Sequence, residues 1–386
     1  MRFLLSLFLL FQLCLFGGSD LSDFDGYQER WTRPEIEKKL EQFLQRDERM
    51  QNFFTLTDEV FTLYDTPISQ KERSVEFCLK LIPSSKKEEG STAKRKNLVG
   101  CKIAIDPGHL GGKYARLEER FIDIPPSLER EKAIAFDEGT LSFLTARYLQ
   151  ILLEKEGAEV MITRKRIGEG VYEKDFFDWL KASPELWWKE AHLTTLFRRY
   201  YNPLDLRARA KRINAYAPDL TVVIHYNSQE VAEGSASNHS VASSNYNMVF
   251  IPGAFCRSEL ITQESRYEFI RLLVTDDLPA SLHLSQAILK QFSSHLGVPV
   301  VSKNDGARYL ENVCLKLDEG VYARNLALTR LVHGPVCYGE TLIQNNIDEC
   351  QTLSRKDFVI DGRRCSSRIK QVAEAYFDGI KEHLLN

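Results

Sequence analysis

The stretch CKIAIDPGH (101–109) predicts a buried strand that runs directly into a turn. Pro107 and Gly108 force the chain to turn, so the imidazole of His109 leaves the sheet at its carboxyl edge. In open α/β sheets, functional groups gather at this edge. The stretch therefore predicts a layered fold and also the place of a site within it.

Strands and helices alternate along the rest of the chain. Apolar runs predict strands at 158–164, 220–227, 247–251 and 333–340, and helical periodicity predicts helices at 138–156, 206–216, 281–296 and 368–384. Glycines at 157 and 297 mark the ends of two of these helices. The alternation favours an α/β domain with a mostly parallel central sheet flanked by helices.

The first residues are typical of a secretory signal peptide. Residues 1–19 combine a basic Arg2, an apolar run that is short for a membrane span, and small residues suited to cleavage. Lipid attachment at Cys14 is disfavoured because Gln12 and Leu13 are not small residues. We expect an exported protein without a stable membrane span after cleavage, located in the periplasm or elsewhere in the extracytoplasmic envelope.

A small N-terminal α+β module of unknown role is expected at residues 20–82. A helix is predicted at 32–45, where Thr32 and Glu35 fit a capping box, and strands are predicted at 53–65 and 74–82. The polar and charged stretch 83–97 predicts a linker. Residues 98–386 then form the main domain, with insertions at about 168–204 and 228–280 that can wall or cover a site. The first insertion carries three of the four Trp and predicts either a lid or ordinary packing.

Composition limits the function classes. The 386-residue chain is 43% hydrophobic, which is enough for a sizeable core, and its formal charge of −3 does not indicate a general nucleic-acid binder. The 8 Cys are scattered without a CxxC pair, so a thiolate zinc site is not expected. Without Cys14 their number is odd, which leaves at least one thiol outside any intramolecular disulfide.

Two histidines end apolar strands and can converge on one metal. His225 closes the strand TVVIH (221–225) as His109 closes the first. Neutral imidazole is a good zinc ligand, and a catalytic zinc site needs three protein ligands. Glu138 opens a helix, where the helix dipole favours a carboxylate, and it is the third candidate. Glu340 ends another strand and could act as a proton acceptor. Taken singly, each of the four residues is more often structural or solvated.

The motifs in this chain resemble those of the zinc-dependent N-acetylmuramoyl-L-alanine amidases of the type-3 (AmiC-like) family, over residues 98 to 385. A strand that ends in Asp-Pro-Gly-His here gives His109, and a Glu that opens a helix before Gly157 and Thr163-Arg164 gives Glu138. The remaining matches are Leu206, Arg209 and Asn214 on a helix, VIHYN (223–227) with His225, Pro335, Glu340 and Asn346 near the end, and Glu349 with the closing helix. Each motif is weak alone, but together in this order they are specific.

The resemblance implies a fold, a ligand set and a reaction. The fold is an amidase/phosphorylase-like α/β domain, one Zn²⁺ is bound by His109, Glu138 and His225, and Glu340 is the catalytic carboxylate. The reaction is hydrolysis of the amide bond between N-acetylmuramic acid and L-alanine in peptidoglycan, in cell-wall remodelling and daughter-cell separation. A peptidoglycan or muropeptide substrate is implied, and a protein activator or septal partner is possible. Contacts to substrate are expected from Asn227, or from the arginines Arg164, Arg209 and Arg330, although ion pairing is the commoner role for each arginine.

The chain departs from the family pattern at several positions. Leu110 replaces the Gly after the Asp-Pro-Gly-His motif, Gly139 replaces the Lys after the ligand Glu, and Leu342 and Ile343 replace a Gly and a Phe after the catalytic Glu. An insertion at 121–136 contains Glu131-Lys132, which mimics the Glu-Lys pair of the family. Glu131 is therefore the competing third ligand, and Glu138 is preferred because its distance to Gly157 fits.

Two other functions stay open from the sequence. A zinc peptidase would cut within the peptidoglycan stem peptide and would need the same metal site. A non-catalytic wall-binding relative would keep the fold without the chemistry. The products of peptidoglycan digestion separate the first from an amidase, and metal analysis tests the second.

Overall fold

The computed structural model describes residues 20–67, 74–86, 95–127, 131–187, 191–229 and 239–385. The expected signal peptide, including Cys14, lies outside the described residues. The chain divides into two compact units. The N-terminal unit comprises residues 1–90 together with 255–275, and the sheet unit comprises residues 91–254 and 276–386.

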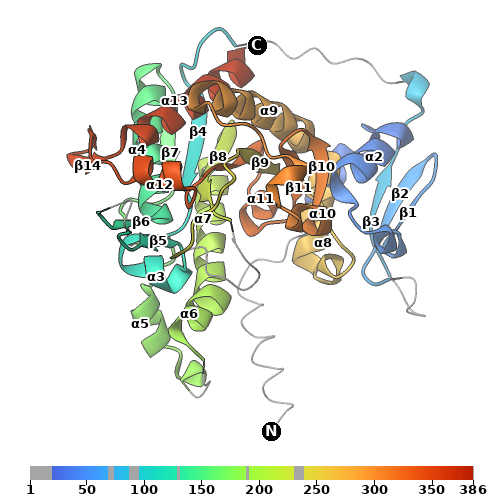
Figure 1. Ribbon diagram of the computed structural model, residues 1–386. Helices are drawn as coiled ribbons and strands as arrows, with labels where there is room; N and C mark the ends of the chain where they lie inside the picture. The colour runs from blue at the N-terminus through green and yellow to red at the C-terminus, as the bar shows by residue number, and fades with distance from the viewer. Residues whose placement is uncertain are drawn as a thin grey trace. The chain divides into compact units, whose positions relative to one another are not determined.

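The sheet unit is built on a seven-stranded sheet (Figure 1). Its order is β10-β11-β9-β12-β8-β4-β7, with bounds Cys314–Asp318, Val321–Arg324, Met248–Ile251, Val336–Ile343, Leu220–Asn227, Lys102–Pro107 and Glu159–Ile162. The four strands β12, β8, β4 and β7 are parallel to one another, and β11 is parallel to β9. The pairs β12–β9 and β10–β11 are antiparallel. The predicted mostly parallel sheet is confirmed, and every predicted strand of this domain is present.

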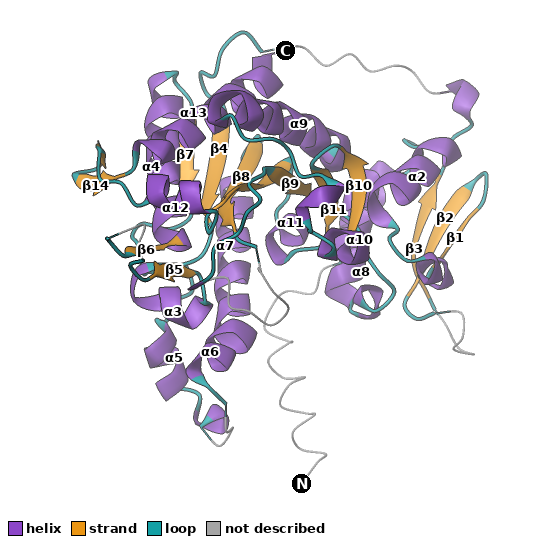
Figure 2. Ribbon diagram, in the orientation of Figure 1, coloured by secondary structure: helices purple, strands orange, loops and turns teal. Residues whose placement is uncertain are grey.

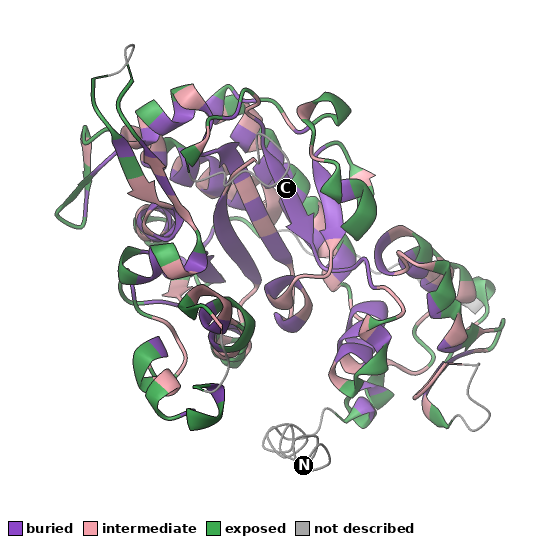
Figure 3. Ribbon diagram, turned by 60° about the horizontal axis from the view of Figure 1, so that its bottom comes forward, coloured by how far each residue is buried: buried purple, intermediate pink, exposed green. Residues whose placement is uncertain are grey.

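Helices cover both faces of this sheet (Figure 2). Helix α4 (Glu138–Lys155) lies against β4, β7 and β8, α9 (Asp277–Leu296) lies against β9 and β12, and α13 (Ser367–Leu385) packs between α4 and α9. On the other face, α7 (Asn202–Tyr216) and α11 (Ala327–Leu331) share a buried apolar cluster with Ala104 and Val223 of the sheet. The central strands are therefore buried on both sides, as Figure 3 shows.

Four short elements lie between β4 and α4. They are the 3₁₀ turn η6 (Gly112–Tyr114), helix α3 (Ala115–Glu118), and strands β5 (Phe121–Ile124) and β6 (Ile134–Asp137). The two strands form an antiparallel hairpin, so the insertion predicted at 121–136 is a hairpin and its loop. It leads directly into α4, because Asp137 pairs with Phe121 and also caps the helix by accepting a hydrogen bond from Thr140 N.

The insertion at 168–204 folds into short helices. They are α5 (Phe176–Lys181), η7 (Pro184–Leu186), α6 (Leu193–Leu196) and the π-helical turn η8 (Phe197–Tyr201), which leads into α7. A buried cluster joins them to the loop after His109, with the members Leu110, Tyr114, Phe176, Leu186, Leu196, Phe197 and Tyr201. The insertion therefore has its own apolar core, and that core includes the residue next to His109.

The remaining elements of the sheet unit are short. The 3₁₀ turn η11 spans Lys303–Asp305, α10 spans Tyr309–Val313 and α12 spans Ile347–Leu353. Strands β13 (Phe358–Ile360) and β14 (Arg363–Cys365) form a separate hairpin before α13. In the part of the chain that the structure describes, no helix is both long and apolar enough to cross a membrane.

The N-terminal unit combines short helices with an antiparallel sheet. The sheet is β1 (Phe54–Leu56), β2 (Val60–Tyr64) and β3 (Val75–Lys80), and the helices are η2 (Leu21–Tyr27), α2 (Arg33–Lys39), the π-helical turn η3 (Leu40–Leu44) and η4 (Glu48–Asn52). The predicted capping box is present, since Glu35 accepts hydrogen bonds from both the N–H and the hydroxyl of Thr32. The predicted α+β character of residues 20–82 agrees with this arrangement.

A segment from the middle of the chain completes the N-terminal unit. It contains η10 (Glu259–Ile261) and α8 (Gln263–Val274). The buried Lys39 Nζ donates hydrogen bonds to Leu273 O at 3.1 Å and Thr275 O at 2.6 Å, and Arg266 pairs with Glu76. The expectation that all of 228–280 is an insertion of the main domain is thus corrected for 255–275, because its apolar helix is buried in the other unit.

We predict that the core of the insertion depends on Phe176. Replacing this fully buried ring by Ala should lower the free energy of unfolding by about 3–5 kcal/mol, because it leaves a cavity among aromatic side chains. Chemical denaturation measures the loss. Phe177→Ala is the matched control, since Phe177 is 43% exposed and should lose much less. Equal losses in both variants would contradict this account of the cluster.

Candidate metal centre

Three side chains meet at the carboxyl edge of the sheet. His109 follows β4, Glu138 is the first residue of α4, and His225 lies near the end of β8. Each offers a ligand atom, and these atoms all lie within 4.8 Å of one another. The structure thus brings together the three residues that the sequence grouped, from three separate elements.

The ring nitrogens converge on one carboxylate oxygen. His225 Nδ1 lies 2.9 Å from Glu138 Oε1, and His109 Nε2 lies 3.4 Å from the same atom. The two imidazole rings are nearly perpendicular, at 85°, with centroids 4.8 Å apart. Two nitrogens and a carboxylate are donors that a divalent cation such as zinc accepts, so the donor set fits a metal.

Glu138 is buried but well supplied with donors. Only 2% of the residue is exposed, and its carboxylate accepts hydrogen bonds from Tyr226 N at 3.2 Å and Gln344 Nε2 at 3.2 Å. Burial opposes its charge, yet His109 and His225 together hold the pKa of the Glu138 carboxyl well below its usual range. The carboxylate is therefore ionised and ready to bind a cation.

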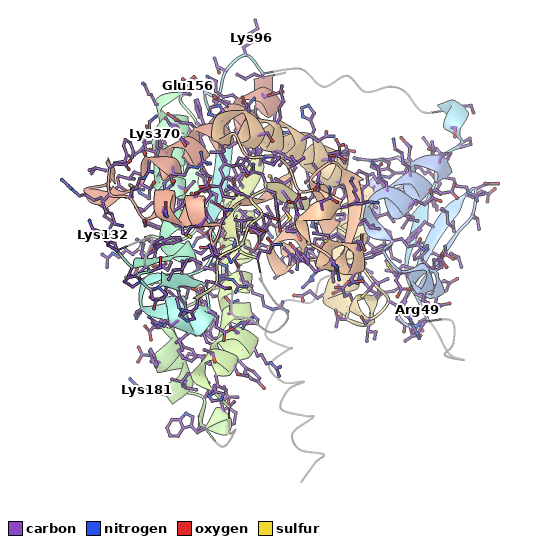
Figure 4. All side chains as sticks on the ribbon, viewed as in Figure 1. Arg49, Lys96, Lys132, Glu156, Lys181 and Lys370 are labelled. Atoms are coloured by element: carbon purple, nitrogen blue, oxygen red, sulfur yellow. The ribbon has the colours of Figure 1, made fainter. Side chains whose placement is uncertain are left out.

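The competing carboxylate lies elsewhere. Glu131 is exposed in the loop between β5 and β6, and its neighbour Lys132 lies at the outer edge of the sheet unit (Figure 4). Of the described residues, only Glu138 forms a potential metal-binding group with the two histidines. The choice of Glu138 by its distance to Gly157 agrees with this geometry.

The two histidines have opposite pKa shifts. Burial lowers the pKa of the His225 imidazole, and contact with Glu138 does not fully offset it. Burial also opposes charge on His109, but Glu138 and Glu118 raise its pKa to about 9. His225 also stacks on Tyr338 of the neighbouring strand, with centroids 4.5 Å apart and an interplanar angle of 11°, which fixes the plane of its ring.

Glu340 lies beside the three ligand candidates. It pairs with His225 in the parallel register of β12 and β8, so both side chains leave the sheet on the same face. Burial and the charge of Glu138 raise the pKa of the Glu340 carboxyl to about 8. No side-chain hydrogen bond or ion pair to Glu340 is present among the described residues, so its carboxyl group can serve a substrate.

Arg209 and Arg164 have structural partners. Arg209 is 1% exposed and pairs with Asp106 at 3.2 Å and Asp205 at 2.8 Å. Arg164 is 2% exposed and donates only to backbone carbonyls, including Pro107 O at 3.0 Å. Both guanidinium groups lie too deep to contact a substrate. Arg209 takes the ion-pair alternative, whereas Arg164 binds backbone carbonyls instead.

The other two expected substrate contacts differ in position. Arg330 lies on α11, which follows β11. Strand β11 runs antiparallel to β8 in the sheet, so α11 lies at the opposite edge of the sheet from His225. Arg330 Nη1 donates to Asn325 Oδ1 at 2.7 Å, and a role in substrate binding finds no support. Asn227 lies two residues after His225 and is half-buried, so it remains a candidate for substrate contact.

Three neighbours of the site were not anticipated. Glu118 contacts His109, Gln344 donates to Glu138, and the Nε of Arg120 lies 3.8 Å from Glu138 Oε2. Gln344 opens the polar run QNN (344–346) directly after β12, at the carboxyl edge of the sheet, and this run is a sequence signal for the site. Glu118 and Arg120 lie in the charged run RLEER (116–120), which in sequence is typical of a solvated surface.

Packing explains one departure from the family pattern, and a second departure places a leucine in a conformation that favours glycine. Gly139 lies against the loop after His109, where a Cβ would come within 2.6 Å of Gly111 Cα and 2.8 Å of Leu110 C, so the Lys expected there does not fit. Leu342 adopts φ +57° at a bulge in β12, a conformation that favours glycine. Its side chain is fully buried, and its N–H donates to Asn247 Oδ1 at 3.1 Å.

Comparison with known families agrees with this site. A sequence model described as N-acetylmuramoyl-L-alanine amidase matches residues 103–382. This range begins in β4, ends in α13 and includes His109, Glu138, His225 and Glu340. No curated protein matches the chain.

Solved amidases are similar to this chain at low sequence identity. Ami1 from Mycobacterium smegmatis is 14% identical, with a TM-score of 0.44 and 75% of this chain and 99% of that chain covered. CwlD from Clostridioides difficile, solved with the GerS lipoprotein, is 16% identical, with a TM-score of 0.42 and 74% and 98% covered. The CwlV catalytic domain from Bacillus (Paenibacillus) polymyxa var. colistinus is 17% identical, with a TM-score of 0.39 and 74% and 99% covered. The family of this chain is given by the sequence match over residues 103–382.

We predict that Gly108 is needed for the position of His225. A Cβ on Gly108 would overlap the imidazole ring of His225, which is held between Glu138 and Tyr338. Gly108→Ala should therefore lower the free energy of unfolding by about 1–3 kcal/mol, the range for overpacking. The control is Gly26→Ala, where a Cβ meets nothing within 4 Å. Denaturation midpoints that agree for both variants would show that the ring can move aside.

Proposed function

Because the chain belongs to the N-acetylmuramoyl-L-alanine amidase family, we propose that it is a zinc-dependent enzyme of the cell envelope that cleaves peptidoglycan between N-acetylmuramic acid and L-alanine. The observation that carries the proposal is the convergence of His109, Glu138 and His225, with Glu340 at the same level of the sheet as His225. A ligand cluster with a carboxyl group beside it is what metal-assisted hydrolysis of an amide requires.

The proposed ligands are His109 through Nε2, His225 through Nδ1, and a Glu138 oxygen. These are the atoms that face one another in the structure. When bound, zinc supplies a Lewis acid that polarises the amide carbonyl and activates water. Three protein ligands would leave the ion free to take one further ligand. The donors are nitrogen and oxygen atoms, and no thiolate is needed.

Glu340 is the proposed proton carrier. As a base, its carboxylate takes a proton from the attacking water, and as an acid it then gives that proton to the amine of the departing L-alanine. A pKa raised to about 8 by burial and by Glu138 means that this carboxyl group can hold a proton near neutral pH. Glu138, with its pKa shifted the other way, stays charged and binds the cation.

The place of action is proposed from the sequence and the substrate together. Peptidoglycan lies outside the cytoplasmic membrane, and residues 1–19 are typical of an export signal. We propose a periplasmic or other extracytoplasmic location, with a role in wall remodelling and daughter-cell separation. A protein activator or septal partner stays a prediction from sequence.

Digestion of purified peptidoglycan tests the reaction. The wild-type protein should release stem peptides that keep their N-terminal L-alanine, as identified by mass spectrometry. Glu340→Gln, which keeps the size of the side chain, should lower the rate about 100-fold or more because the proton carrier is lost. Shortened stem peptides would instead identify a peptidase, and full activity of Glu340→Gln would remove Glu340 from the mechanism.

Metal analysis tests the ligand set independently of activity. Purified wild-type protein should contain one zinc per chain, and His225→Ala should lose it because one of three ligands is missing. Glu131→Ala is the matched control, since Glu131 is exposed and outside the cluster. Wild-type protein without affinity for zinc would favour the non-catalytic wall-binding alternative.

A further inference from the structure

The turn that carries His109 has an unusual backbone. His109 adopts φ +53°, a left-handed conformation that residues with a side chain rarely take. Such a conformation persists only where the surroundings hold it. The groups that hold this turn in place therefore also position the imidazole of His109.

Glu118 binds the N–H groups of this turn. Its carboxylate accepts a hydrogen bond from Leu110 N, 2.9 Å from both oxygens, and from Gly111 N at 3.0 Å. The carbonyls of the same turn are bound from the other side by Arg164, which donates to Gly108 O at 3.2 Å and Leu110 O at 3.1 Å. Donors and acceptors of the turn are thus bound by two buried charged groups.

Glu118 also contacts the imidazole itself. Its Oε1 lies 3.4 Å from His109 Nδ1, while Nε2 on the far side of the ring faces Glu138. Glu118 is only 4% exposed, so the contact is shielded from water. The two ring nitrogens therefore have different partners, one toward Glu118 and one toward the metal cluster.

We propose that Glu118 is a positioning residue that sets the tautomer and orientation of His109 for metal binding. A carboxylate at Nδ1 favours the tautomer with its proton on that atom, so the lone pair is left on Nε2, where Glu138 and His225 lie. The same carboxylate holds the backbone N–H groups of the two residues that follow His109. This inference rests on the proposed metal site and adds a residue outside every motif that identified the family.

The chemistry requires a carboxylate at this position. Among the described residues, the hydrogen-bond and ion-pair partners of Glu118 are all donors: two backbone N–H groups and the imidazole. A Gln side chain has the same shape but replaces one acceptor oxygen with an NH₂ group. Whichever way the amide lies, that NH₂ group would point at a donor of the turn or at the imidazole, so Glu118→Gln disturbs the support of His109 without opening a cavity.

The test measures metal affinity without activity. Zinc is removed from the full-length protein by chelation and returned in competition with a chromophoric chelator. Cobalt substitution then reports ligand geometry through its visible absorption. Glu118→Gln should bind zinc about 10–100-fold more weakly and change the cobalt spectrum, since removing a hydrogen-bond partner of a ligating His has this effect. Glu119→Gln is the matched control, because the adjacent Glu119 is exposed and pairs with Arg198.

The outcomes separate positioning from structural support. A lower melting temperature with wild-type zinc affinity and an unchanged cobalt spectrum would overturn the proposal and leave Glu118 a structural residue. If wild-type protein binds no zinc, the proposed function fails together with this inference. If the wild-type protein binds zinc and Glu118→Gln binds it with the same affinity, this inference fails and the proposed function stands.

A second measurement applies if Glu118→Gln does not fold. Long-range ¹H–¹⁵N correlation spectra of the zinc-loaded wild-type protein, labelled at histidine, give the tautomer of His109. We expect a protonated Nδ1 and a metal-bound Nε2. Metal bound through Nδ1 would contradict the proposal, because that atom would then carry no proton to donate in a hydrogen bond to Glu118.

Discussion

Two buried guanidinium groups fix the turn between β4 and α3, and the position of the site depends on them. Arg209 reaches Asp106 and Pro107 O from α7, and Arg164 reaches the following carbonyls from the end of β7. Loss of one partner from a buried ion pair of this kind typically costs about 3–5 kcal/mol, because the remaining charge is left unpaired. The arginines therefore connect two elements, α7 and β7, to the turn that carries His109.

The two carboxyl groups near the ligands are pushed in opposite directions by their surroundings. Glu138 lies between two imidazoles and receives hydrogen bonds from Tyr226 and Gln344, so its charge is stabilised despite burial. Glu340 has no such donor among the described residues and feels the charge of Glu138, so its pKa rises to about 8. Two carboxyl groups with separated pKa values can take different roles, one as a ligand and one as a proton carrier.

The insertion at 168–204 is connected to this site by packing. Leu110, which takes the place of a glycine in the family pattern, is fully buried in the aromatic cluster of α5, η7, α6 and η8. Glu118 binds the N–H of that same Leu110. The backbone of Leu110 is thus bound by Glu118 beside the metal centre, and its side chain packs in the core of the insertion.

The sequence by itself determined the local structure and the nature of the chemistry. Apolar runs and helix-ending glycines located the strands and helices, because these signals depend on residues close together in the chain. His109, His225 and Glu340 were identified because each ends a strand, and in a largely parallel sheet such ends lie at one edge. Glu138 was chosen over Glu131 by counting to Gly157, and the family motifs supplied the reaction.

Only the tertiary structure decided which distant groups meet. Glu118 belongs to a charged run that is indistinguishable from a surface helix in sequence, and its burial against His109 arises from the return of the chain through α3. The residues 255–275 pack in the N-terminal unit, although nothing near them in sequence indicates it. Arg209 matched a family motif, but its burial beside Asp106 and Asp205 gave it a structural role. The contacts of 255–275 and of Arg209 with Asp106 join residues far apart in the chain, and the contact of Glu118 with His109 depends on how the chain turns between them. A local sequence pattern carries no information about such contacts.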